Sequence, residues 1–207
     1  DRLYLATLGG PVTHITTGAS LTVNNQLDIT DNGANTVNLG LGTGSLACRA
    51  EPDDLVHYYE IDPAIIHIAR DPNLFSFVSS CRPNLPIVLG DARLTLADAP
   101  DGIYDLIVVD AFTSDAIPIH LLTREAMEIY LKKLSPHGMV ALHVSNRYLE
   151  LASVVAGIAA ANGALTRVNN SAQVDETTNP YKYSGTVAAV VRNPWAGDRN
   201  AGGSSGG

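Results

Sequence analysis

The chain has 207 residues, of which 45% are hydrophobic and 16% are charged. This composition is typical of one folded globular domain and excludes an intrinsically disordered chain. The formal net charge of −8 disfavours a nucleic-acid partner, and the longest apolar runs, 106–109 and 187–191, fall far short of the roughly 18 residues that span a bilayer.

The two ends of the chain differ in composition from its middle. Residues 1–35 contain many Thr, Asn and Gly, and 14–23 predicts a hairpin or a pair of short strands. The Gly/Ser-rich tail, 196–207, is expected to be disordered. We therefore expect a short β-rich segment, a main domain over 36–195 and a disordered tail.

From residue 36 onward, apolar runs that predict strands alternate with helical patterns. The predicted strands are 36–41, 56–61, 87–89, 104–110, 139–145 and 186–191. The predicted helices are 63–70, 92–97, 121–134 and 149–162. This alternation predicts an α/β fold with a doubly wound, mostly parallel, Rossmann-like sheet. Such sheets bind ligands at the carboxyl ends of their strands.

A glycine-rich turn follows the first of these strands. It carries Gly40, Gly42 and Gly44, and glycines there permit a tight turn and a close approach of a ligand to the backbone. The alternative is a plain glycine turn. The dinucleotide fingerprint GxGxxG requires glycine at position 45, where this chain has Ser45, and this departure disfavours a nicotinamide cofactor.

Acidic residues stand at the ends of the next two strands. Glu60 lies 20 positions after Gly40, where an acid can accept hydrogen bonds from both ribose hydroxyls, unless it is merely a surface acid. Asp91 could accept from an exocyclic adenine amine or could cap the helix predicted from residue 92, and both roles are compatible. These positions predict a nucleoside pocket.

The fourth strand ends on Asp110, and Asp115 follows in a loop that contains no basic residue. We expect both carboxylates to await a cationic substrate; the alternatives are that Asp110 only orients its loop and that Asp115 is solvated. His143 and Asn146 leave the fifth strand toward the same edge and are candidates for an acceptor pocket, although a strand-end histidine is often structural.

The chain has two cysteines, Cys48 and Cys81, and neither belongs to a CxxC pair. Two cysteines are too few for a disulfide scaffold. We therefore expect reduced thiols and a cytoplasmic location.

Five segments resemble the spermidine synthase-like family, whose members have the fold of class I S-adenosylmethionine-dependent methyltransferases. They are LGLGTGSLA, YYEIDP, VLGDARLTLA, YDLIVVDAFTSDAIPIHLLTREA and LHVSNRYL. The resemblance covers roughly residues 36–165. It implies a transferase whose co-substrate is S-adenosylmethionine or its decarboxylated form, with no metal.

The resemblance also implies a role for each residue of the nucleoside site. Glu60 would hold the ribose, Asp91 with Ala92 the adenine, and the loop 40–44, including Thr43, the amino-acid or aminopropyl arm.

The same resemblance bears on the acceptor. Asp110 would receive the proton of an attacking amine, and Asp115 would hold the remote ammonium group of a diamine. A small-molecule amine is thus the implied partner. The resemblance further implies a homodimer. Because the chain begins with Asp1, we also expect a longer parent protein, in which a membrane segment could precede it.

Two departures from the family pattern leave alternatives open. Thr43 stands where the family has an acid that binds the amine of the aminopropyl arm, and residues 1–35 lack the upstream acid, tyrosine and histidine motif. His14 and Asp28 are nearby but do not have its spacing. The leading interpretation is an aminopropyltransferase; the alternatives are a small-molecule methyltransferase and a non-catalytic domain that kept the fold.

Overall fold

The structure is a computed structural model that describes residues 2–5, 13–16, 35–51, 53–111, 117–146, 149–170 and 185–192. Within these ranges the strands are β1 (Arg2–Leu5), β2 (Thr13–Thr16), β3 (Asn35–Leu39), β4 (Leu55–Glu60), β5 (Ile87–Leu89), β6 (Tyr104–Val109), β7 (Leu134–His143), β8 (Ala164–Asn170) and β9 (Thr186–Arg192). The α-helices are α1 (Pro63–Arg70), α2 (Phe77–Cys81), α3 (Ala92–Asp98), α4 (Arg124–Lys133) and α5 (Leu151–Ala161). Two 3-10 turns are η1 (Ser45–Cys48) and η2 (Ile119–Leu121).

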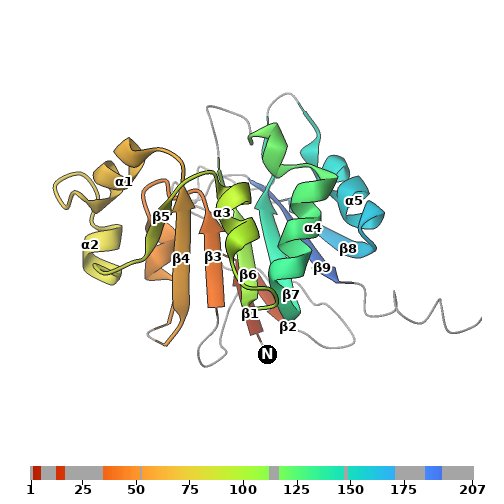
Figure 1. Cartoon of the computed structure of the whole chain (residues 1–207), viewed down its shortest axis with the longest axis horizontal. Helices are drawn as coiled ribbons and strands as arrows, with labels where there is room; N and C mark the ends of the chain where they lie inside the picture. The colour runs from red at the N-terminus through yellow and green to blue at the C-terminus, as the bar shows by residue number, and fades with distance from the viewer. Residues whose placement is uncertain are drawn as a thin grey trace, which may run out of the picture.

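Seven strands form one sheet in the order β5-β4-β3-β6-β7-β9-β8 (Figure 1). The first five are parallel, whereas β9 runs antiparallel to both β7 and β8. The chain winds from β3 outward to β5 and then restarts at β6 on the other side of β3. The sheet thus has its topological switch point between β3 and β6, and the predicted α/β fold with a mostly parallel sheet is confirmed.

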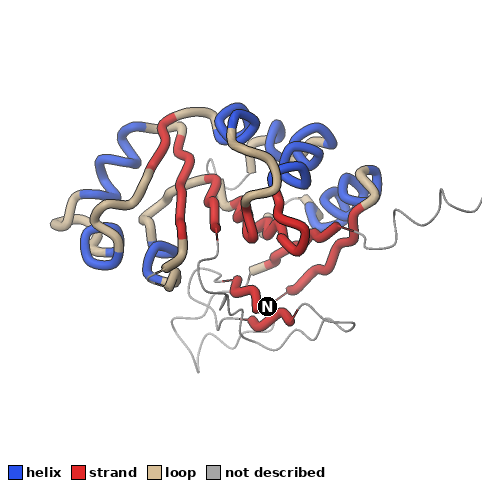
Figure 2. The backbone as a smooth tube through the Cα atoms, turned by 60° about the horizontal axis from the view of Figure 1, so that its bottom comes forward, coloured by secondary structure: helices blue, strands red, loops and turns tan. Residues whose placement is uncertain are grey.

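The described part of the N-terminal segment forms a separate two-stranded antiparallel sheet. Strand β1 pairs with β2, with Arg2 opposite Thr16, and the two form a sheet of their own; Figure 2 shows both strands close to the N-terminus. The strands expected over 14–23 therefore include β2, but its partner lies earlier in the chain. The remainder of the predicted segment and the tail 196–207 lie outside the described residues, so those boundaries stay predictions.

Apolar side chains on the two faces of the sheet build two core clusters. Successive residues of a strand point to opposite faces, and Tyr58 and Tyr59 of β4 belong to different clusters. The larger cluster packs α3, α4 and α5 against one face, as Figure 1 shows. The smaller cluster packs η1, α1 and α2 against the other face at β4.

Capping residues set where the helices begin. Asp62 accepts a hydrogen bond from the Ala64 amide (2.8 Å), and α1 has the predicted bounds. Thr123 caps α4 through the Ala126 amide (3.1 Å), so this helix begins three residues later than predicted.

Helix α2 and strand β8 escaped the sequence prediction, as did β1 and η1, and one strand is longer than expected. Helix α2 has five residues, too few to show a helical period, and β8 is an edge strand with half-exposed apolar positions. Strand β7 begins at Leu134, five residues before its predicted start, and its register against β6 shifts between Tyr104 and Leu106. Within the described residues, no helix is both long enough and apolar enough to cross a bilayer.

Candidate functional site

The loops that follow the parallel strands are joined by backbone hydrogen bonds at the carboxyl edge of the sheet. The Asp110 amide donates to the Leu39 carbonyl (3.0 Å), and the Gly90 amide donates to the Glu60 carbonyl (2.9 Å). The predicted site residues of β3, β4, β5 and β6 therefore lie along one edge, beside the switch point of the sheet.

The three glycines of the loop after β3 all have left-handed backbone conformations, with φ of +101° at Gly40, +52° at Gly42 and +78° at Gly44. A Cβ atom at Gly40 would lie 2.7 Å from the carbonyl oxygen of Asp110, and one at Gly44 would collide with the Val78 side chain of α2. A Cβ atom at Gly42 would meet nothing within 4 Å. The first and third glycines are thus required for close packing, whereas the second leaves open space above the loop.

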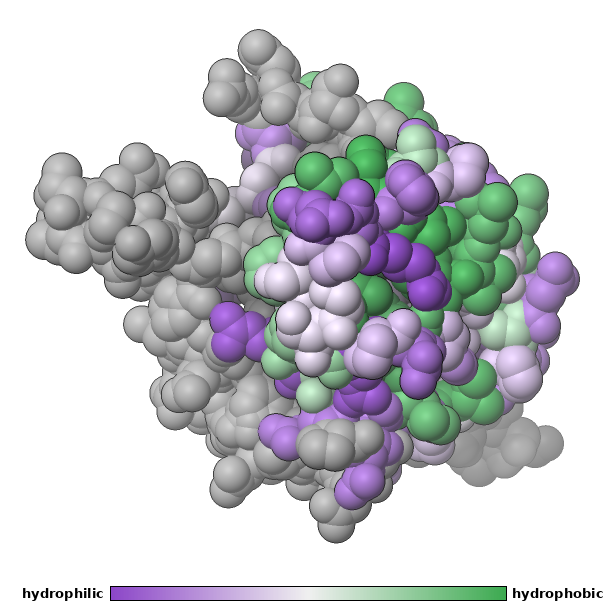
Figure 3. Space-filling model, turned by 90° about the vertical axis from the view of Figure 1, so that its left-hand side faces the viewer, coloured by the Kyte–Doolittle hydropathy of each residue, from purple (hydrophilic) through white to green (hydrophobic). Residues whose placement is uncertain are grey.

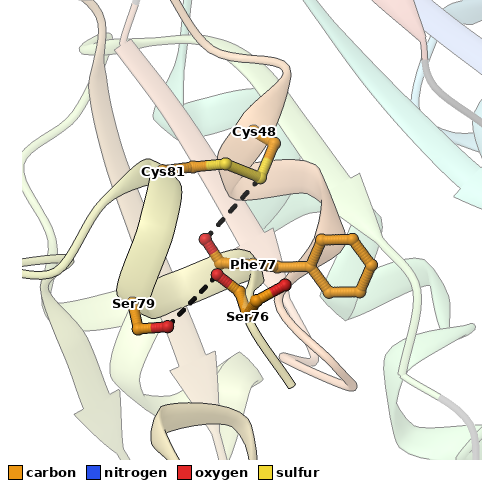
Figure 4. Close-up of a disulfide and its surroundings, with 5 residues drawn as sticks. All are labelled: Cys48, Ser76, Phe77, Ser79 and Cys81. Atoms are coloured by element: carbon orange, nitrogen blue, oxygen red, sulfur yellow. Dashed lines mark hydrogen bonds between the residues drawn. A yellow bond between two sulfur atoms is a disulfide. The ribbon is translucent and has the colours of Figure 1, made fainter. Parts of the chain in front are cut away.

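A disulfide joins the turn that follows this loop to α2, so the sequence prediction of reduced thiols was wrong. Cys48 in η1 and Cys81 at the end of α2 are bonded, with their Cα atoms 5.1 Å apart (Figure 4). The Cys48 sulfur lies 3.6 Å from the Phe77 carbonyl oxygen. The prediction was wrong because the two cysteines are 33 residues apart in sequence and only the packing of α2 against η1 brings them together.

Glu60 is buried, with 9% of its surface exposed, so the alternative of a surface acid is wrong. Its Oε2 accepts a hydrogen bond from the Leu41 amide (2.9 Å) and its Oε1 accepts one from the Asp62 amide (3.0 Å). Each carboxylate oxygen can accept two hydrogen bonds, so both keep capacity for a further donor. Glu60 therefore orients the glycine loop and still presents acceptors at the strand tip.

Asp91 caps the N-terminus of α3, which was one of its two predicted roles. Its Oδ1 accepts hydrogen bonds from the amides of Arg93 (2.9 Å) and Leu94 (3.1 Å). Its Oδ2 lies 3.2 Å from Nε2 of His120, which belongs to η2. Oδ2 is thus the oxygen that points toward the neighbouring loop, next to Ala92 at the start of α3.

Asp110 has a basic neighbour that its own loop does not supply. Nδ1 of His143, the last residue of β7, lies 2.8 Å from Oδ1 of Asp110. Nε2 of the same ring lies 2.8 Å from the Ser145 hydroxyl, which accepts a hydrogen bond from the Thr186 amide (2.8 Å). Asp110 thus has a hydrogen-bond partner outside its own loop, because parallel pairing of β6 with β7 brings a histidine from 33 residues away. The role of Asp110 toward a cationic substrate stays a prediction.

The two remaining acceptor-site predictions have different outcomes. Asn146 uses its side-chain oxygen to accept a hydrogen bond from the Leu149 amide (2.9 Å), which orders the start of the segment before α5. Asp115 lies outside the described residues. Lining of an acceptor pocket by Asn146 and the binding of a remote ammonium group by Asp115 both stay predictions.

Sequence reasoning missed Tyr58, a buried tyrosine of β4 beneath the glycine loop. Burial and the nearby charge of Asp110 raise the pKa of its hydroxyl. No sequence pattern distinguishes it from Tyr59, which faces the other core cluster.

Apolar side chains flank the polar strand tips. Ile61, directly after Glu60, is 63% exposed, and Ile119, beside His120, is 84% exposed. Leu89 and Leu94 on the β5 and α3 side are also exposed, and Figure 3 shows apolar surface gathered on the side of the molecule that carries α1, α2 and β5. Polar groups edged by exposed apolar side chains suit a ligand with a flat ring and polar substituents.

Comparison with known proteins gives one relative in sequence and several in structure. No family model matches the chain. A polyamine aminopropyltransferase of Vibrio vulnificus (strain CMCP6) is 36% identical over 107 residues, which are 49% of this chain and 34% of that protein. The matched region thus spans about a third of its relative's length.

Solved structures share the fold at low sequence identity. Spermidine synthase in complex with the transition-state analogue AdoDATO has a TM-score of 0.61 at 16% identity, covering 88% of this chain and 67% of that one. Spermidine synthase of Thermotoga maritima has a TM-score of 0.58 at 15% identity, covering 91% and 72%.

Methyltransferases are similar to the same degree. Human methyltransferase-like protein 13, in complex with SAH, has a TM-score of 0.59 at 20% identity, covering 79% of this chain and 74% of that one. The chain therefore shares its fold with spermidine synthases and with S-adenosylmethionine-type methyltransferases, and over 107 residues its sequence is similar to that of a polyamine aminopropyltransferase.

Proposed function

We propose that the chain binds an S-adenosylmethionine-type nucleoside and transfers an aminopropyl group from decarboxylated S-adenosylmethionine to an amine. The observation that carries the proposal is the contact between the two loops of the site. Gly40 packs against the backbone of Asp110, so the start of the glycine loop adjoins the strand tip that carries this carboxylate. A donor held by the first loop and an amine held at Asp110 would then be neighbours.

The nucleoside would use groups that still have hydrogen-bonding capacity. Glu60 would accept from the ribose hydroxyls through its remaining lone pairs. Oδ2 of Asp91, beside Ala92, would accept from the adenine amine in place of His120. The open space over Gly42, with Thr43 next to it, would admit the arm that carries the sulfonium.

The chemistry needs one bond made, one broken and one proton removed. The nitrogen lone pair forms a bond to the methylene carbon beside the sulfonium, and the carbon–sulfur bond breaks with its electron pair left on sulfur as a thioether. The proton lost by nitrogen passes to the Asp110 carboxylate. Alignment of nitrogen and carbon can supply roughly 7–11 kcal/mol, and the base a further factor of roughly a hundred to ten thousand.

Methyl transfer is the second candidate, and Thr43 favours it. The family resemblance implies an acid at this position, which would bind the amine of the aminopropyl arm. A neutral threonine does not repel the carboxylate of ordinary S-adenosylmethionine.

The test is a pair of calorimetric titrations, S-adenosylmethionine against its decarboxylated form, followed by product masses with a panel of diamines. We expect tighter binding of the decarboxylated form and products heavier by one aminopropyl group. Asp110→Asn should abolish product formation and retain nucleoside binding, whereas Asp98→Asn on exposed α3 should change neither. Tighter binding of the carboxylated form with methylated products would support the second candidate, and binding of neither would support a non-catalytic domain.

The cellular location, the oligomeric state and the parent protein are three further predictions. A cytoplasmic location stays a prediction, and the disulfide argues against it because cytosolic thiols are kept reduced. The homodimer, and the membrane segment in a longer parent, likewise stay predictions.

A further inference from the structure

We propose that His143 is a positioning residue for Asp110: it fixes the rotation of the carboxylate so that one oxygen faces the acceptor amine. The inference rests on the proposed function for its catalytic consequence, but the pairing itself can be measured without any reaction.

The geometry forms an ordered chain of hydrogen bonds from β9 to β6. The Thr186 amide donates to the Ser145 hydroxyl oxygen, the hydroxyl lies against Nε2 of His143, and Nδ1 lies against Oδ1 of Asp110; each of these distances is 2.8 Å. Both ring nitrogens are thus in contact with groups held by the sheet. The side chains of His143 and Asp110 are 29% and 22% exposed, so the pair is only partly open to solvent.

The contacts of this chain are compatible with a neutral imidazole, and this is the form that the proposal uses. A carboxylate oxygen can only accept, so Nδ1 carries a proton and donates it to Asp110. The Ser145 oxygen already accepts from an amide and keeps its own hydroxyl proton, which Nε2 can accept. A neutral ring protonated on Nδ1 therefore satisfies every donor of the chain without adding a positive charge to the site.

This arrangement assigns different roles to the two oxygens of Asp110. Oδ1 is held by His143, and Oδ2 accepts no hydrogen bond from the described residues. The backbone of Asp110 is fixed separately by its bond to Leu39. With both ends fixed, Oδ2 is the oxygen that takes the proton of the amine, and loss of His143 frees the carboxylate to rotate.

Two substitutions of His143 separate positioning from packing. Asn places Nδ2 where the ring has Nδ1, so His143→Asn keeps a donor to Asp110, whereas His143→Leu removes it. We expect His143→Leu to lower kcat roughly 10- to 100-fold with little change in nucleoside Kd. His143→Asn should restore most of the loss. His137→Asn, which changes an exposed histidine of β7, is the control and should have no effect.

The pairing is tested directly by nitrogen NMR of the histidines. The chain has six histidines, and the spectrum of His143→Asn identifies the signals of residue 143 by their loss. We expect Nδ1 protonated and Nε2 unprotonated at neutral pH, with this preference weakened in Asp110→Ala.

The two measurements distinguish failure of this inference from failure of the proposed function. Protonation on Nε2 alone, or equal activity of His143→Leu and wild type, would overturn the positioning role even if aminopropyl transfer occurs. If wild type forms no product with any amine while the Nδ1-protonated form is found, the proposed function fails and the pairing stands as a structural feature.

Discussion

Gly40 and Gly42 stand two residues apart in one loop, but their missing side chains meet different needs. At Gly40 the neighbour is backbone, the carbonyl of Asp110, which cannot move aside as a flexible side chain can. At Gly42 only the backbone conformation favours glycine, since the space beside it is open. The two positions therefore form a matched pair for separating packing from conformational strain.

We expect Gly40→Ala to weaken nucleoside binding by tenfold or more and to lower the melting temperature, because the added Cβ displaces the strand tip that carries Asp110. Gly42→Ala should cost only the left-handed conformation, roughly 1–2 kcal/mol of stability. Calorimetric titration and thermal unfolding of both variants check this. Equal effects on binding would show that the contact with Asp110 is unimportant.

Lys133 and Asp101 form an ion pair whose effect should depend on pH. The hydrogen bonds from Lys133, and then those from Lys132, hold the pKa of the Asp101 carboxyl below its usual range. A lowered folded-state pKa contributes stability above the unfolded value, and this contribution is lost as the pH falls through the folded value. Lys133 is buried and also donates to the Ala97 carbonyl (2.8 Å), so it retains partners when the carboxylate is removed.

Asp101→Asn should therefore lower the melting temperature near neutral pH, and the difference from wild type should shrink in acid, below the normal range for aspartate. Melting curves across this range provide the measurement. Asp98→Asn, which removes an exposed acid nearby, serves as the control. A difference that persists unchanged in acid would contradict the assignment.

At the scale of elements, η1 and α2 act together as the support of the glycine loop. Val78 of α2 fills the space beside Gly44, and the disulfide joins the two elements at Cys48 and Cys81. Arg82, directly after α2, also donates to the Asp54 carbonyl (3.0 Å) and so holds the segment that leads into β4. The glycine loop is therefore supported by the five-residue helix α2 rather than by a long helix of its own.

Removing the disulfide should destabilise this support. Closing a loop of 33 residues is worth about 3–4 kcal/mol in the chain-entropy account. The double variant Cys48→Ser/Cys81→Ser should therefore unfold earlier in denaturant and bind the nucleoside more weakly. Reductant should reproduce both effects in wild type and change nothing in the variant. Identical unfolding of oxidised and reduced wild type would show that the bond is absent or without consequence.

Helices and strands that have a local signal in the sequence could be predicted. Helix α1 has the predicted bounds because its start is encoded locally by Asp62 and Pro63. The end of β6 was predicted to within one residue, at Asp110 against Val109 in the structure, because a continuous apolar run stops there. Elements without such local signals, α2 and β8, were not predicted.

For the whole molecule, the sequence was informative about layers and strand tips and uninformative about partners across the sheet. The glycine loop, Glu60 and Asp91 could be proposed as site residues because each follows its own strand in a recognisable order. The pairing of Asp110 with His143 joins residues far apart in the chain, as does the disulfide, and both depend on which strands and helices become neighbours. Placement of β9 between β7 and β8 likewise has no local signal.

The tight contacts of the glycine loop also limit how donor preference can evolve. Positions 40 and 44 are closed to side chains by Asp110 and Val78, and position 42 tolerates one only in a strained conformation. Residue 43 is then the position in the loop where a charge can be gained or lost without rebuilding the site. Relatives that bind a different nucleoside should therefore differ from this chain at Thr43. A library randomised at this one codon would test which nucleosides the loop can bind.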